Sequence, residues 1–138
     1  MLLYLVKQVE LAARSRLDDL VRPAGLTALQ YTALTVLERD TDLSSAQLAR
    51  RSFVTAQATA DMITALETRG LIERHRDPAD RRRLVIALTT LGQDLVDQYR
   101  DPVRAVEADM LAGLSEPEIA GLRYGLTACR ANLAGHRD

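Results

Sequence analysis

Several residue types on which protein function often depends are rare in this sequence. Its 138 residues include one cysteine, two histidines, one phenylalanine and no tryptophan. One cysteine excludes a disulfide within the chain and a zinc site built from cysteines, and two histidines argue against a metal-sensing cluster. So few aromatic rings argue against a surface that stacks the bases of single strands. We therefore expect no metal and no cofactor.

Long apolar runs are missing too. No segment approaches the roughly 18 to 20 apolar residues that a membrane span needs. Residues 1–6 are apolar, but they are too few, and no small-residue cleavage site of a signal peptide follows them. The sequence also lacks a nucleophile paired with a base, a phosphate-binding loop and metal-ligand spacing. We expect a cytoplasmic protein that is not an enzyme and has no membrane partner.

The formal net charge of −1 is close to zero, which at first argues against a nucleic-acid partner. The charge is, however, unevenly distributed. Residues 44–83 contain eight basic and five acidic residues, whereas residues 94–118 contain two basic and seven acidic ones. Seventeen of the 18 basic residues are arginine, the side chain better suited to phosphate and guanine. The basic middle segment is therefore the candidate for binding nucleic acid.

Apolar residues recur at three- and four-residue intervals along most of the chain, which predicts helices. Three helix starts carry a capping box, a Ser or Thr followed three residues later by Glu or Gln. These pairs are Thr27 with Gln30, Ser44 with Gln47, and Ser115 with Glu118. The pattern predicts six helices, over residues 1–22, 27–39, 45–52, 55–70, 90–112 and 115–133.

Each predicted helix has an apolar face that should pack inward. In the fourth helix this face holds Thr59, Met62, Ile63 and Leu66. In the fifth helix it holds Leu91, Leu95, Tyr99, Val103, Val106 and Met110. Cys129 lies on the apolar face of the last helix, so we expect it to be a small core residue rather than a redox sensor.

The helical period is lost between residues 71 and 88. Residues 71–76 alternate in polarity, and residues 84–88 are apolar and partly β-branched, so both segments are predicted to be strands. A polar turn with three consecutive arginines, residues 77–83, joins them. Two short helices connected by residues 53–55 and followed by a hairpin are typical of a winged helix-turn-helix.

In such a fold the second helix of the pair enters the major groove of DNA. Gln57 can form two hydrogen bonds to adenine, Asp61 can accept one from cytosine N4, and an alanine can contact the thymine methyl. The alternative to DNA contact is that Thr55 and Gln57 serve only to start the helix. The outward face of this recognition helix is predicted to hold Thr55, Ala56, Gln57, Ala60, Asp61 and Thr64.

The predicted hairpin is rich in arginine. Arginine at a hairpin tip suits the negative potential of a narrow minor groove, although charge on an edge strand also protects against aggregation. We expect Arg81, Arg82 and Arg83 to contact DNA from the tip. Candidates for phosphate contacts are Arg50, Arg51, Arg74 and Arg76.

The helices at the two ends of the chain are not needed by a compact winged helix. Their apolar stripes are therefore predicted to form an interface between two copies of the chain, which would place two recognition helices about 34 Å apart, one turn of DNA. The alternative is a helical cap within one chain.

The predicted fold is mainly α, with four helices, a β-hairpin wing and two C-terminal helices in a single domain, residues 1–138. Residues 27–89 form its DNA-binding lobe, and residues 1–22 plus 90–135 its dimerisation region.

Three segments resemble the MarR family of bacterial transcriptional regulators: Leu48-Ala49-Arg50-Arg51, residues 66–72, and the wing from Arg76 to Thr89 with Gly92 after it. The wing segment is the most specific, and the resemblance covers essentially the whole chain. It implies a homodimeric winged-helix regulator, usually a repressor, that binds double-stranded DNA at a pseudo-palindromic operator.

The resemblance also implies roles for single residues. The arginine matching Arg82 enters the minor groove, and the aspartate matching Asp80 helps to fix the wing. Asp61 stands where many members carry arginine, so the operator sequence is not carried over. A branch of the family senses peroxide through a cysteine in the first helix, which this chain lacks.

Members of the family commonly respond to a small aromatic or phenolic effector bound between the dimerisation helices and the DNA-binding lobe. On that resemblance, Tyr4, Arg16, Tyr31 and His75 are the candidate ligand residues, each with packing or an ordinary surface position as the alternative. A second hypothesis for the whole chain is a winged-helix module that binds another protein without specific DNA binding. The weak positive charge of the recognition helix favours it, and the wing arginines argue against it.

Overall fold

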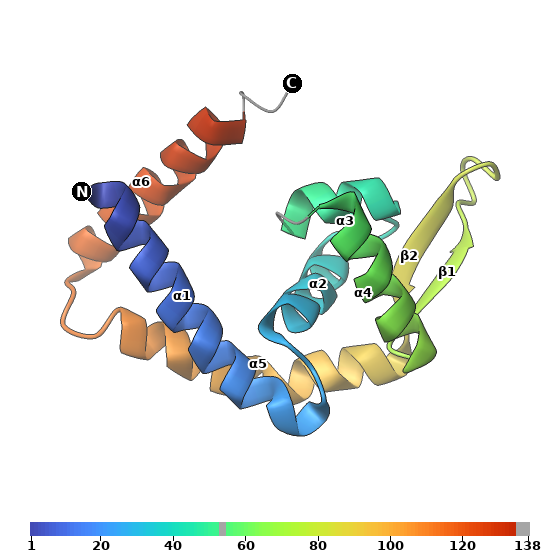
Figure 1. The fold of residues 1–138 in the computed structure, drawn as a ribbon, viewed down its shortest axis with the longest axis horizontal. Helices are drawn as coiled ribbons and strands as arrows, with labels where there is room; N and C mark the ends of the chain where they lie inside the picture. Colours follow the sequence, from blue (N-terminus) through green and yellow to red (C-terminus); the bar gives the residue numbers. More distant parts are fainter. Residues whose placement is uncertain (53–54, 135–138) are drawn as a thin grey trace. The chain divides into compact units, whose positions relative to one another are not determined.

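The order of elements in the computed structural model is the predicted one, and the model describes residues 1–52 and 55–134 (Figure 1). The connection at Phe53 and Val54 and the tail 135–138 lie outside the described residues. The elements are α1 (Leu2–Val21), the 3-10 turn η1 (Arg22–Ala24), α2 (Ala28–Arg39), α3 (Ser45–Ser52), α4 (Ala56–Thr68), β1 (Ile72–Arg76), β2 (Leu84–Leu88), α5 (Thr90–Met110) and α6 (Glu116–Ala134).

All three predicted capping boxes are confirmed. At the start of α2, the Gln30 N–H donates to Thr27 Oγ1 at 3.1 Å and the Thr27 N–H donates to Gln30 Oε1 at 3.0 Å. The same reciprocal pair is present at Ser44 and Gln47 before α3, and at Ser115 before α6. These bonds satisfy N–H groups that have no partner within the helix, which is why the helices begin where the sequence indicates.

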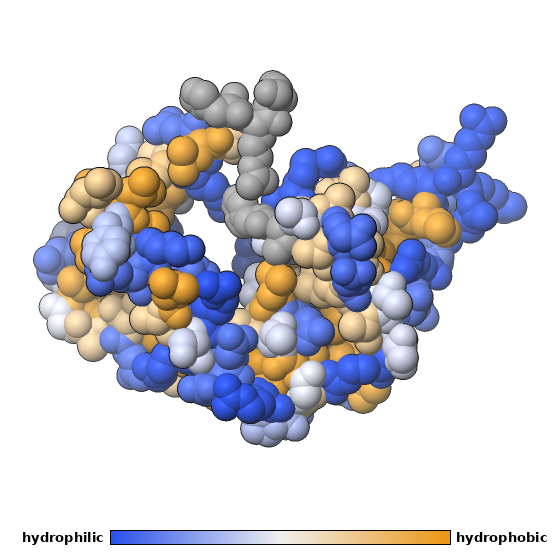
Figure 2. All heavy atoms as spheres, in the orientation of Figure 1, coloured by the Kyte–Doolittle hydropathy of each residue, from blue (hydrophilic) through white to orange (hydrophobic). Residues whose placement is uncertain are grey.

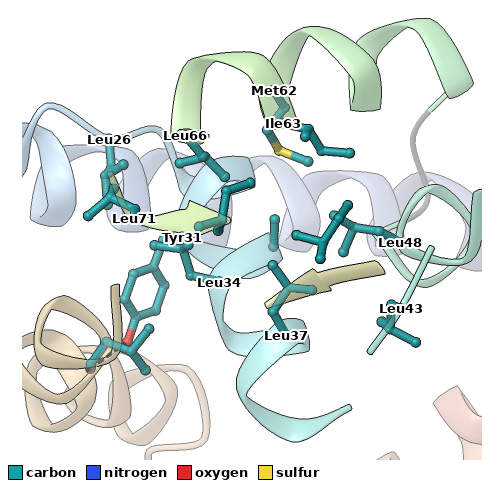
Figure 3. Close-up of a cluster of buried hydrophobic side chains, with 14 of the residues drawn as sticks. Leu26, Tyr31, Leu34, Leu37, Leu43, Leu48, Met62, Ile63, Leu66 and Leu71 are labelled. Atoms are coloured by element: carbon teal, nitrogen blue, oxygen red, sulfur yellow. Dashed lines mark hydrogen bonds between the residues drawn. The ribbon is translucent and has the colours of Figure 1, made fainter. Parts of the chain in front are cut away.

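The chain divides into two compact units, Met1–Val106 and Glu107–Asp138, and the first contains the core. The core is centred on α2, whose Leu34 and Leu37 are buried. Around them lie buried aliphatic side chains from α3, α4, the two strands and α5 (Figure 3). Because α2 supplies apolar side chains to so many neighbours, the helix pair and the hairpin form one packed lobe.

The hairpin is antiparallel, with Ile72 opposite Leu88 and Arg76 opposite Leu84. It also pairs with the loop before α3, where the Ile86 N–H donates to the Leu43 carbonyl at 2.8 Å. The first strand begins at Ile72, one residue later than predicted. Leu71 instead closes the end of α4, because its N–H donates to the Leu66 carbonyl at 3.1 Å next to Gly70, which has a left-handed φ of 73°.

The predicted inward stripe of α5 is partly wrong. Leu91 is 56% exposed, and the buried residues of the helix are Gly92 and Val96. The cause is a close backbone approach: a Cβ atom added at Gly92 would lie 2.1 Å from the Leu71 carbonyl oxygen. Packing on this glycine rotates the start of the helix away from the predicted face. The helix continues through Pro102 and ends at Met110, two residues before the predicted end.

In the second unit, α6 has apolar residues but no buried one. The expectation that Cys129 is a core residue is wrong, since its side chain is exposed. The apolar side chains at the start of α1 are exposed as well, and Leu3 is 72% exposed. Both faces are apolar in sequence, and among the described residues their large side chains are mostly exposed. Within the described residues, no helix is both long and apolar enough to cross a membrane.

Candidate nucleic-acid interface

One face of α4 is exposed because the opposite face is anchored in the core. Thr59, Ile63 and Leu66 are almost fully buried, and Met62 lies beside them. Side chains between these positions must therefore point outward. The structure leaves exposed all six residues predicted for this face: Thr55, Ala56, Gln57, Ala60, Asp61 and Thr64. Ala58 and Ala65 are exposed as well, and their positions off the buried stripe could have identified them.

The polar groups of this face are partly engaged with one another. Thr55 Oγ1 accepts the Ala58 N–H at 3.1 Å, so it caps the helix, and its own O–H remains available to donate. Gln57 Nε2 donates to Asp61 Oδ1 at 3.2 Å, one helical turn further on. The segment from Ala56 to Leu66 contains no lysine or arginine. The face therefore offers methyl groups, an amide and a carboxylate, but no positive charge.

The wing tip is held by two aspartates. Asp77 Oδ1 accepts the Ala79 N–H at 2.9 Å, and Asp80 Oδ1 accepts the Arg82 N–H at 3.1 Å. Such bonds from an aspartate to the backbone two residues on are typical of tight turns. In the described part of the chain, the exposed side chains of Arg81 and Arg82 have no partner. The wing is hydrophilic over most of its visible surface (Figure 2).

Arg83 differs from its two neighbours, although the sequence groups all three. Its Nη1 lies 3.2 Å from Asp77 Oδ2, and its Nη2 donates to Gln47 Oε1 on α3. The side chain is partly buried at the base of the wing. The expectation that all three arginines project toward DNA is therefore not met for Arg83.

The four arginines predicted to contact phosphate are all exposed, but most have partners. Arg51 pairs with Asp40, and Arg74 Nε lies 3.2 Å from Glu67 Oε2. Arg76 donates to the Arg81 carbonyl at 3.1 Å. Among the described residues, Arg50 has no side-chain partner, so it is the least committed of the four.

The predicted effector residues do not form one site around Tyr4. Tyr4 is exposed and lies in a surface hollow lined only by α1 and Met1, to which the other three do not contribute. His75 Nε2 lies 3.3 Å from Asp42 Oδ1, and Arg16 is exposed on α1. No three histidine, cysteine, aspartate or glutamate side chains in residues 1–52 and 55–134 lie together as a metal ion requires.

Tyr31 is a core residue (Figure 3). Its hydroxyl donates to the Val96 carbonyl at 3.3 Å, and its ring meets Tyr99 edge to face with the centroids 6.3 Å apart. Burial raises the pKa of this phenol. Tyr31 therefore joins α2 to α5 as a packing residue, which is the alternative given for it above.

Two long-range polar contacts that position the lobe were not predicted from the sequence. Arg69, at the end of α4, donates to the Gly25 carbonyl at 3.0 Å in the turn before α2. Arg100 on α5 bonds both Glu38 on α2, at 2.5 Å, and Asp97, at 2.9 Å. These hydrogen bonds lower the pKa of both carboxyl groups and raise that of Arg100. Asp97 lies only three residues from Arg100, but the partners Gly25 and Glu38 are far from their arginines in sequence, so no local pattern could identify them.

An exposed recognition helix beside an arginine-tipped hairpin defines a winged-helix protein of the class that binds double-stranded DNA. Comparisons with known proteins give the family. Residues 24–83 match the MarR family. The chain is 34% identical over 115 residues to the HTH-type transcriptional repressors Rv2887 of Mycobacterium tuberculosis and Mb2911 of Mycobacterium bovis, with 83% of each chain covered.

Solved structures agree with the fold. The structure resembles MepR from S. aureus in a complex with DNA, with a TM-score of 0.82 and 25% identity over 94% of this chain and 96% of MepR. It also resembles a MarR variant from E. coli complexed with operator DNA, with a TM-score of 0.80 and 24% identity over 91% of each chain. This chain belongs to the MarR family of DNA-binding transcriptional regulators and is not an enzyme.

Proposed function

We propose that the protein is a homodimeric repressor that binds a pseudo-palindromic operator through α4 and the wing of each protomer, and that a small aromatic or phenolic effector releases it. The observation that carries the proposal is the presence of two complementary exposed surfaces on one packed lobe. The face of α4 offers groups that read base edges, and Arg81 and Arg82 extend unpartnered from the wing. Repression is supported by the names of the curated relatives.

In this proposal, residues 27–89 are the DNA-binding lobe, and residues 1–22 plus 90–135 form the dimerisation region. The exposed apolar side chains of α1 and α6 support this division. Leu3 on α1 and Leu133 on α6 are more than 70% exposed, and Val6 and Leu126 are about half exposed. A soluble chain rarely leaves such contiguous apolar faces uncovered, and a second copy would bury them. Because its target is chromosomal DNA, we also propose a cytoplasmic location.

Release by an effector rests on the family alone. Tyr4 and Arg16 on α1 remain candidates for contacts with such a ligand, and His75 is a candidate on the wing. Tyr31 would take part only through its packing against Tyr99 on α5. A binding assay with phenolic acids, followed by the DNA titration below in their presence, tests this part of the proposal. No effect of any compound on affinity would contradict it.

The experiment that tests DNA binding is a titration of labelled DNA. Sequencing the DNA that co-purifies with the protein identifies candidate operators, and binding is then measured at several salt concentrations. We expect specific binding that weakens steeply as salt rises, because phosphate contacts release counterions. Arg82→Ala should bind less tightly. The proposal is overturned if the wild-type protein binds no candidate operator even at low salt.

A second candidate function is a winged-helix module that binds another protein. The absence of cations from Ala56 to Leu66 on α4 and the negative charge of Asp61 favour it, since both reduce attraction to phosphate. The titration distinguishes the two functions. Loss of binding on Arg82→Ala, together with discrimination between operator and random DNA, excludes the protein-interaction module.

A further inference from the structure

We propose that Arg83 is a positioning residue that fixes the wing against α3, so that it acts on DNA through Arg81 and Arg82 rather than by a phosphate contact of its own. The inference rests on the proposed DNA-binding function and assigns different roles to three consecutive arginines. Three contacts of the Arg83 side chain at the base of the wing support it.

The first contact is with the capping box of α3. Gln47 Oε1 accepts the Ser44 N–H at 2.9 Å and also accepts Arg83 Nη2. Gln47 in turn donates its backbone N–H to Ser44 Oγ at 3.2 Å. One amide oxygen therefore both caps the N-terminus of α3 and accepts a hydrogen bond from the wing. The orientation of the wing relative to α3 thus depends on the capping box.

The second contact is with the other end of the hairpin turn. Arg83 Nη1 lies 3.2 Å from Asp77 Oδ2, and the Asp77 side chain is only 13% exposed. The other carboxylate oxygen of Asp77 holds the backbone of the tip at Ala79. The charge of Arg83 is thus already paired in a partly desolvated site, where an ion pair is screened less than at the surface.

The third contact is with the loop before α3. Arg83 Nη2 reaches the Asp42 carbonyl at 3.5 Å, and the Asp42 carboxylate faces His75 on β1. Asp42 has a φ of 60°, a left-handed conformation that costs energy in a residue other than glycine and is retained only where its surroundings hold it. Leu43 next to it pairs with Ile86 on β2. The Arg83 guanidinium therefore adds a side-chain contact to the backbone pairing that already joins this loop to the wing.

A fixed wing binds DNA better than a mobile one, because its ordering cost is met before docking. If Arg83 only positions the wing, its loss lowers affinity but removes no phosphate contact. The slope of log affinity against log salt, which changes by about 0.9 per phosphate contact, then stays the same. If Arg83 contacts phosphate, the slope falls and another cation can replace it.

The test compares Arg83→Gln, Arg83→Lys and Arg82→Ala in operator titrations at several salt concentrations. Lysine keeps the charge but has no planar fork with which to bridge Asp77 and Gln47. We expect both Arg83 variants to lose about tenfold in affinity with an unchanged salt slope, and Arg82→Ala to lose affinity with a slope lower by about one. In the double variant Arg82→Ala/Arg83→Gln, the two losses should be less than additive.

A measurement without DNA separates this inference from the proposed function. Amide hydrogen exchange of residues 77–83 should accelerate in both Arg83 variants and stay at the wild-type rate in Arg82→Ala, with unchanged circular dichroism showing that the lobe is folded. The inference is overturned if Arg83→Lys retains wild-type affinity while Arg83→Gln loses salt dependence. It is also overturned if exchange in the wing is unchanged. Failure of the proposed function shows separately, as an absence of binding by the wild-type protein.

Discussion

The outward face of α4 and the tip of the wing belong to the same lobe but have opposite chemistry. The α4 face presents methyl groups, an amide and a carboxylate, whereas the wing tip presents two arginines without partners in the described chain. Sequence-independent affinity for DNA comes mainly from cations that meet phosphate or the minor groove, and selectivity comes from groups that meet base edges. The difference indicates that this protein separates the two tasks between the two surfaces.

The two surfaces also differ in how they are held. Buried side chains along the whole of one face fix α4 in the core, so its position depends on packing. The tip of the wing, beyond the buried residues of its strands, is held by polar contacts at its base and by carboxylates that organise its turn. Changes in the core should therefore affect both surfaces, and changes at the base of the wing should affect only one.

The largest effect is expected for Gly92→Ala, which should destabilise the lobe that carries both surfaces. The added methyl group would lie 2.1 Å from the Leu71 carbonyl oxygen, a backbone atom that cannot move without shifting the junction of α4 with β1. We expect a loss of about 2 kcal/mol or more in the free energy of unfolding, measured by urea denaturation.

Gly121→Ala on α6 is the matched control for this change. Nothing lies within 4 Å of a Cβ at Gly121, so alanine should be neutral or slightly stabilising through its higher helix propensity. Equal stability of the two variants would show that the close approach at Gly92 does not constrain the fold.

Arg82→Ala and Gln57→Ala should separate the two surfaces. We expect the wing variant to lose about tenfold to 100-fold in affinity for operator and for random DNA alike, with a lower salt slope. The α4 variant should lose operator affinity but little affinity for random DNA. Both are measured by fluorescence anisotropy on the two DNAs. A loss of selectivity in Arg82→Ala and not in Gln57→Ala would reverse the assignment.

Asp61 allows a finer test of the α4 face. Its carboxylate accepts one hydrogen of the Gln57 amide, which leaves the amide oxygen and the second hydrogen as an acceptor and donor that match adenine. Asp61→Asn keeps an acceptor and removes the charge, whereas Asp61→Ala removes both. We expect both variants to bind all DNA a few-fold more tightly, and only Asp61→Ala to lose discrimination between adenine and guanine at one operator position. Equal discrimination by the two variants would show that Asp61 acts by charge alone.

The smallest effect is expected for Glu38→Gln, at the contact of α2 with α5 and away from both surfaces. The hydrogen bond from Arg100, and then that from Gln93, holds the pKa of Glu38 below its ordinary value of 4.5. A lowered pKa stabilises the folded chain above pH 4.5, and this contribution is lost as the pH falls through the folded value. The melting temperature of the wild type should therefore exceed that of the variant slightly at pH 7, and the difference should shrink as the pH falls below 4.5 and disappear once it is below the folded pKa of Glu38. A difference independent of pH would contradict this.

Much of the fold could be predicted from local patterns. The capping boxes at Thr27, Ser44 and Ser115 require only residues three apart, and the buried face of α4 follows from its period. The positions where prediction failed depend on partners distant in sequence. Leu91 is exposed because Gly92 contacts Leu71, and Arg83 turns inward because Gln47 lies nearby in space.

The sequence by itself determined the elements, their order and the residues on the face of α4, because helical period and capping depend on neighbours within one turn. The wing motif also indicated the family to which the chain belongs. Only the tertiary structure decided which one of three consecutive arginines is paired among the described residues, which face of α5 is buried, and that Tyr31 belongs to the core. Each of these depends on a contact between segments that fold together from distant parts of the chain, where close packing and the pairing of buried charge select one arrangement.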